Sequence, residues 1–235
     1  MKFHFLLSYA GRNELENMAE SDKVALLQKI VALPGSEESW NAILELFAAW
    51  PESPAKQSAL DWADSALDSW NDEVRSLRSS SSYIYENGGL ANFTRIARSV
   101  EINNREVHGN EELTIIAMSP QLSRLRRLSI YRSEIYREGF QALVTASWLN
   151  GLTHLSLASL TLHREELVVL CTSTAFKSLS VLTLRNVGLQ QPKLQVLLNA
   201  PFLRQLTLLD LSHNSISPEE TTQLKNLFKQ VQLIV

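Results

Sequence analysis

The residues that could carry covalent chemistry are few, and their spacing does not match an active site. Asp210, Ser212 and His213 supply the atoms of a hydrolase triad, but Asp210 and Ser212 fall on one predicted strand and no nucleophile elbow surrounds the serine. The five histidines never occur at metal-ligand spacing, and the sequence contains no glycine-rich phosphate loop. We therefore predict a non-enzymatic protein without metal or cofactor.

The single cysteine, Cys171, is interpreted as a core residue. It follows Leu170 on a predicted helix, where a small buried apolar side chain is expected, and a reactive thiol is the less favoured interpretation. One cysteine cannot form an intrachain disulfide or a thiolate metal cluster, which fits a reducing cytosol. We expect a cytoplasmic protein.

Composition argues against nucleic-acid and membrane binding. The net charge is −3 and the isoelectric point is near 6.0, so the chain as a whole does not attract polyanions or an anionic membrane. No stretch approaches the roughly 18 consecutive apolar residues that a membrane span requires. The short apolar run at the N-terminus is interrupted by His4, and we interpret it as the first strand or helix turn rather than as a signal peptide.

One aliphatic spacing recurs every 27 or 28 residues through the second half of the chain. The clearest copy consists of Leu206, Leu209, Leu211, Asn214 and Ile216. The earlier copies are Leu179, Leu182, Leu184, Val187 and Leu189; Leu152, Leu155, Leu157, Leu160 and Leu162; Leu125, Leu128, Ile130, Ser133 and Ile135; and the degenerate Ala97, Val100, Ile102, Arg105 and Val107. Each copy predicts a strand, and one such unit cannot bury its apolar edge unless the next unit stacks on it.

The connectors between these strands change to helical spacing. The helical pairs are Phe140 with Leu143, Leu167 with Leu170, and Leu194 with Leu197. Ser217 and Pro218, followed by two glutamates, are typical of a helix start. Each unit is therefore predicted to be a strand followed by an outer helix.

This pattern resembles the leucine-rich-repeat family, and its unit length looks like the ribonuclease-inhibitor-like subclass. The stretch from Ile135 to Leu143 is similar to the strand-to-helix turn of that subclass. The resemblance covers about residues 94 to 235 and implies an α/β fold, a short right-handed solenoid of parallel strands with outer helices. The family's inward asparagine survives only as Asn214, so apolar side chains must replace the asparagine ladder elsewhere.

The first half of the chain carries no such repeat and predicts helices over residues 13–33, 37–50 and 55–77. We expect a helical cap or companion domain over residues 1–82 and a repeat domain of about five units over 90–235, with the serines of 79–82 as the linker candidate. Trp40, Trp50, Trp62 and Trp70 could form an aromatic site, but packing in the core or cap is the preferred interpretation.

Alternation places one residue of each strand in a central column on the solvated, concave face: Glu101, Ser129, Ser156, Thr183 and Asp210. Beside this column the amino-terminal part of the arc is basic and partly aromatic, and residue types of this kind are frequent in binding hot spots. The predicted partner-binding residues are Arg98, Arg126, Arg127, Tyr131, Arg132, His154 and Arg185. The hypothesis is an acidic protein segment docking there; a solvated face without a dedicated partner is equally compatible with the sequence.

Three functions remain open at this point. The first is a protein-binding module, an adaptor or scaffold; the second is a regulatory inhibitor that occludes a partner enzyme; the third is an uncharacterised enzyme in the helical half. Residues 231–235 alternate like a strand, and an uncapped edge there could support self-association. A short closing strand covered by its own terminus is the slightly preferred alternative.

Overall fold

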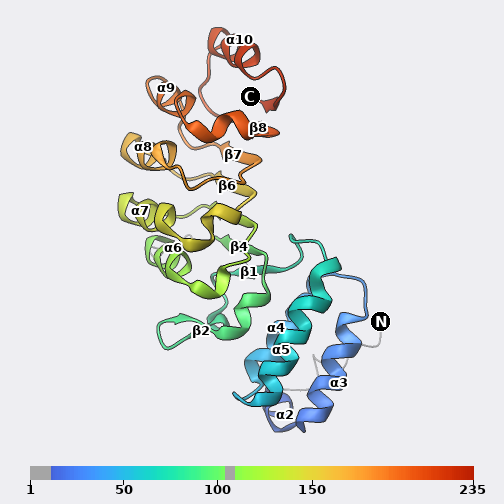
Figure 1. Cartoon of the computed structure of the whole chain (residues 1–235). Coiled ribbons are helices and arrows are strands. Elements are labelled where there is room, and N and C mark those ends of the chain that lie inside the picture. Colours follow the sequence, from blue (N-terminus) through green and yellow to red (C-terminus); the bar gives the residue numbers. More distant parts are fainter. Residues whose placement is uncertain (1–11, 104–108) are drawn as a thin grey trace.

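The computed structural model describes residues 12–103 and 109–235, and its main feature is a seven-stranded parallel sheet (Figure 1). The strands follow one another in chain order. They are β1 (Ser76–Arg78), β4 (Ser99–Ile102), β5 (Arg127–Tyr131), β6 (His154–Ala158), β7 (Val181–Arg185), β8 (Leu208–Asp210) and β9 (Gln232–Ile234). The predicted N-terminal element over residues 1–11, and Arg105 and Val107 of the first repeat copy, lie outside the described residues.

Helices occupy one side of the sheet, and each connects two consecutive strands. They are α6 (Gly109–Met118), α7 (Arg137–Thr145), α8 (Arg164–Thr172), α9 (Lys193–Leu198) and α10 (Pro218–Leu227). Short 3-10 turns follow three of these helices: η4 (Pro120–Leu122), η5 (Ser147–Gly151) and η6 (Pro201–Gln205). Ser217 caps α10 by accepting a hydrogen bond from the backbone of Glu220, whose side chain returns one to the Ser217 N–H. The predicted helix start is confirmed.

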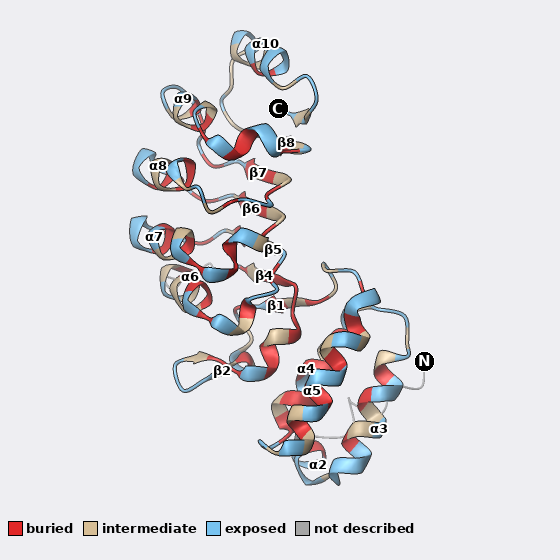
Figure 2. Ribbon diagram, in the orientation of Figure 1, coloured by how far each residue is buried: buried red, intermediate tan, exposed pale blue. Residues whose placement is uncertain are grey.

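The predicted register between the strands is confirmed. Leu128, Leu155, Leu182 and Leu209 lie opposite one another in adjacent strands, and each is 2% exposed or less. Figure 2 shows the buried residues lying between the sheet and the helices. Along β5, β6 and β7, buried residues alternate with residues that are half-buried or exposed. The sheet therefore has one packed face and one face open to solvent. We call the second one the open face.

The first half of the chain is helical as far as residue 69, with α2 (Arg12–Asn17), α3 (Glu20–Val31), α4 (Glu37–Ala49), α5 (Pro54–Ala66) and η1 (Leu67–Ser69). The helix predicted over 13–33 is interrupted because Ala19 is extended. Among the tryptophans, Trp40, Trp50 and Trp70 are buried, which confirms their predicted packing role, whereas Trp62 is 40% exposed.

The helix predicted over residues 55–77 is wrong beyond Ala66. Its last residues form β1, where Leu77 pairs with Val100 of β4. Leu77 precedes Val100 by 23 residues rather than 27 or 28, so the repeat spacing did not reveal this strand. The linker candidate over residues 79–82 ends at the first residue of η2 (Ser82–Ile84), and a small hairpin of β2 (Tyr85–Glu86) and β3 (Gly89–Leu90) follows.

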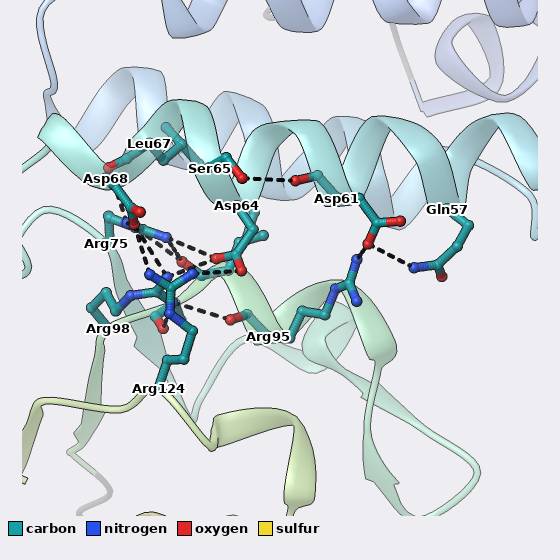
Figure 3. A network of polar contacts seen from close by, with 12 residues as sticks. Gln57, Asp61, Asp64, Ser65, Leu67, Asp68, Arg75, Arg95, Arg98 and Arg124 are labelled. Atoms are coloured by element: carbon teal, nitrogen blue, oxygen red, sulfur yellow. Dashed lines mark hydrogen bonds and ion pairs between the residues drawn. The ribbon is translucent and has the colours of Figure 1, made fainter. Parts of the chain in front are cut away.

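Ion pairs fix the first half of the chain to the sheet (Figure 3). Asp64 of α5 accepts hydrogen bonds from Arg98 and Arg124, each at 2.7 Å, and lies 3.4 Å from Arg75. Each of these three arginines lies shortly before one of three neighbouring strands: Arg75 before β1, Arg98 before β4 and Arg124 before β5. Burial opposes ionisation of Asp64, but the hydrogen bonds and charges of Arg98 and Arg124 outweigh it and lower its pKa. We call this cluster of Asp64 with Arg75, Arg98 and Arg124 the joint, and it is therefore ionic at neutral pH.

Four equivalent residues just after β5, β6, β7 and β8 adopt the left-handed backbone conformation. They are Arg132, Ser159, Asn186 and His213, with φ between 52° and 59°. Asparagine tolerates this conformation, whereas other L-residues lose roughly 1–2 kcal/mol in it. The chain turns away from the sheet here, and the residue at this position in each unit borders the open face.

This conformation predicts opposite effects of two substitutions at Ser159, whose side chain is exposed. Ser159→Gly relieves the clash but makes the unfolded chain more flexible, so its free energy of unfolding should stay within about 1 kcal/mol of wild type. Ser159→Val should lose about 1–3 kcal/mol, because a β-branched side chain is poorly accommodated at positive φ. Urea denaturation of the two variants measures this difference, and equal stability would contradict the assigned backbone conformation.

Candidate functional site

The open face carries a broad polar hollow of about 1010 Å³. Its floor contains Glu101, Ser129 and Ser156, which lie opposite one another on β4, β5 and β6. Thr183 and Asp210 continue the same column on β7 and β8, so the predicted central column is confirmed. A row of hydroxyl groups flanked by two carboxylates can exchange hydrogen bonds with a ligand.

Two arginine side chains, which we call the cationic wall, line the hollow beside His213. Arg132, Arg185 and His213 all line it, and Arg185 and His213 are in contact through Nη2 and Nε2 at 3.0 Å. The backbone N–H of Arg132 donates to the oxygen of Ala158 at 3.2 Å, but its exposed side chain makes no hydrogen bond or ion pair within residues 12–103 and 109–235. Neither arginine has a carboxylate partner in that part of the chain. This wall is available to a negatively charged ligand.

The amino-terminal side of the open face is occupied by the protein's own contacts. Arg127 forms an ion pair with Glu73 at 2.6 Å, and the Tyr131 hydroxyl donates to the carboxylate of Glu101. Burial and the bond to Glu101 raise the pKa of Tyr131 to about 12, so its hydroxyl stays protonated. A second hollow of about 380 Å³ lies here, and Glu37 and Trp40 of α4 reach its rim.

The other predicted binding residues lie away from the cationic wall. Arg98 is 3% exposed and belongs to the joint with Asp64, so it cannot present its charge on the open face. Arg126 is exposed just before β5 and donates to the backbone oxygen of Gly151 at 3.0 Å. His154 lies opposite Arg127 in the sheet. Burial, and then the charge of Arg127, lowers the His154 pKa, so this ring is neutral at pH 7.

The structure therefore separates the predicted residues into two groups. Arg132 and Arg185 share a hollow with Tyr131, whereas Arg98, Arg126, Arg127 and His154 do not line it. Sequence reasoning missed the acidic partner of Arg127, because Glu73 belongs to the segment before the repeat. It also missed the contact of Arg185, the last residue of β7, with His213, which lies beyond the end of β8.

The candidate catalytic residues are engaged elsewhere. The carboxylate of Asp210 accepts a hydrogen bond from the backbone N–H of Ser212 at 2.9 Å, and His213 contacts Arg185. Cys171 is buried as predicted, and burial raises the pKa of its thiol to about 12. Within the described part of the chain, no group of three or more histidine, cysteine or acidic side chains could hold a metal ion, and no helix is both long and apolar enough to cross a membrane.

No model of a known protein family matches the sequence, and a search of curated proteins gives no match. The function has to be inferred from the residues of the open face and their contacts.

Proposed function

We propose that the chain is a leucine-rich-repeat protein, a short right-handed solenoid with an N-terminal helical cap, that binds an acidic segment of a protein partner on its open face. It acts as a non-catalytic adaptor or scaffold. The 27-residue spacing, the in-register parallel strands and the helices on one side support the fold assignment. The buried single cysteine favours a cytoplasmic location.

The distribution of paired and unpaired cations carries this proposal. At the start of β5, the positive charge of Arg127 is already compensated by Glu73. At the carboxyl ends of β5 and β7, Arg132 and Arg185 border the hollow without an acidic partner among the described residues. An incoming carboxylate can form charge-assisted hydrogen bonds with either guanidinium without first breaking an internal ion pair. The overall charge of −3 disfavours nucleic acid as the ligand.

A pair of double charge reversals tests the proposal. The open-face variant is Arg132→Glu with Arg185→Glu. The control is Arg137→Glu with Arg164→Glu, which makes the same change in charge at exposed positions of α7 and α8. Each is compared with wild type in affinity purification from the native cell, followed by binding measurements on the purified partner.

The open-face variant should bind the partner at least about tenfold more weakly than wild type, because two favourable charge contacts become repulsive. The helix-face control should bind within about twofold of wild type, because charges remote from an interface change affinity little. Equal binding by both variants would overturn the proposal. Retention that is abolished by nuclease would point to nucleic acid instead.

A further inference from the structure

The last strand of the sheet has one unpaired edge. Among the described residues β9 pairs with β8 alone. Toward β8, the N–H of Gln232 donates to the oxygen of Thr207 at 2.8 Å, and the oxygen of Ile234 accepts from the N–H of Leu211 at 2.7 Å. Because successive residues of a strand direct their N–H and C=O groups to opposite sides, those of Leu233 point to the unpaired edge.

The opposite edge of the sheet is covered. The indole Nε1 of Trp40 donates to the backbone oxygen of Ser76 in β1 at 2.8 Å, and Arg78 is paired with Glu37 of the same helix. Figure 1 shows α10 and the C-terminus at the end of the stack that lies away from α2–α5. Proteins commonly protect edge strands with charged residues, proline or a covering element. Residues 231–235 include no charged side chain and no proline.

Exposed apolar side chains are concentrated in the last helix and strand of the stack. Of the six large apolar residues that are exposed in the described chain, three belong to α10, β9 and the residue after it: Leu227 at 64%, Ile234 at 40% and Val235 at 42%. Helix α10 buries a single residue, Leu224, whereas α8 in the middle of the stack buries four. The last layer is therefore the least covered one. Burial of its apolar side chains against a partner would stabilise the complex.

We propose that β9 is a self-association surface on which two copies of the chain pair antiparallel about a two-fold axis beside Leu233. In this arrangement the two Leu233 residues exchange both N–H to C=O hydrogen bonds, and Gln232 lies opposite Ile234 of the second copy. Leu227 and Val235 supply apolar surface at the border of the contact.

A second copy is the occupant that this edge itself specifies. One donor and one acceptor from the same residue face outward, and a two-fold axis matches each with its counterpart in an identical strand. No side chain of residues 231–235 is charged, so side-chain charges do not oppose the approach of a second copy. Two copies satisfy both edges, so the assembly closes as a dimer rather than growing into a fibre.

The dimer is expected to be weak, because an edge of three residues supports an interface below the size of permanent dimers. Sedimentation of the full chain from about 5 to about 500 µM spans the dissociation constant expected for such a contact. The average mass should rise from 26.5 kDa toward twice that value. Ile234→Lys should remain at the monomer mass throughout. Met118→Lys, a matched change at a 77% exposed residue of α6, should associate like wild type.

A cross-linking experiment tests the two-fold axis itself. In a hydrogen-bonded antiparallel pair the two Cα atoms are about 5.5 Å apart, which is compatible with a disulfide. Leu233→Cys should therefore form a covalent dimer under mild oxidation, and Met118→Cys should not. The native Cys171 is buried and does not compete. A wild-type chain that stays monomeric over the whole range, equal association of the two lysine variants, or equal cross-linking of the two cysteine variants would overturn the proposal.

Discussion

Arg75→Ala is expected to lower the free energy of unfolding by about 3–5 kcal/mol, the range found when one partner of a buried ion pair is removed. Arg75 is 1% exposed. It donates to the backbone oxygens of Leu67 and Ile96, each at 2.9 Å, and lies 3.4 Å from a carboxylate oxygen of Asp64. Truncation leaves those oxygens without this donor and opens a cavity, and each consequence is destabilising.

Arg78→Ala is the matched control for this substitution. The side chains of Arg78 and Glu37 are 52% and 64% exposed, and solvent screening limits such a pair to about 1 kcal/mol or less. Chemical denaturation of the two variants measures the difference. Burial, followed by the charge of Arg98, lowers the pKa of Arg75 to about 10, so the residue stays charged at neutral pH. A loss of less than 1 kcal/mol in Arg75→Ala would mean that the joint between α5 and the strands is not formed as described.

Asn214→Ala is expected to lower the free energy of unfolding by about 2–4 kcal/mol, because it removes the side-chain partner of several backbone N–H and C=O groups and leaves those groups unsatisfied. The amide oxygen of Asn214 accepts from the N–H groups of Val187 and Leu189, at 3.1 and 3.0 Å. Its nitrogen donates to the oxygens of Leu184 and Leu211, both at 2.7 Å. A single side chain therefore connects the turn after β7 to the turn after β8.

Asn199→Ala provides the comparison for this prediction. Asn199 is exposed and makes one side-chain hydrogen bond, to the oxygen of Gln195 at 2.9 Å, so its loss should lower the free energy of unfolding by less than about 1 kcal/mol. In Asn214→Ala, hydrogen exchange should accelerate first in β8, α10 and β9, because these elements depend on that turn. Uniform acceleration over the whole sheet, or a stability equal to that of Asn199→Ala, would contradict the role assigned to Asn214.

Much of the sheet could be predicted from the sequence, because period-two alternation inside a 27-residue repeat encodes both the strand and its register. Strands β4 to β8, their packed face and the capped start of α10 all follow from local spacing. Leu77 of β1 was missed because its distance from Val100 breaks that period. Helix α5 ends at Ala66 although apolar residues continue at helical spacing. The last of these residues, Leu77, instead pairs with Val100 of β4.

The candidate site was less predictable for a physical reason. Sequence spacing gives the column that a residue occupies on a strand, but it does not say which charges the folded chain brings beside that column. Glu73 forms an ion pair with Arg127, and Asp64 forms one with Arg98. Both acids come from the half of the chain that has no repeat. Arg132 and Arg185 retain their predicted place, since none of the described residues before Glu101 lines the hollow.

Photo-crosslinking from the floor of the hollow tests most directly whether the open face is the binding surface. A photoreactive amino acid is placed at Ser156, in the centre of the hollow, and separately at Gln141, an exposed residue of α7 on the helix side. With the purified partner, the Ser156 probe should give a covalent adduct and the Gln141 probe should give none. An adduct from Gln141 together with none from Ser156 would place the partner on the helices and contradict the proposed role of the open face.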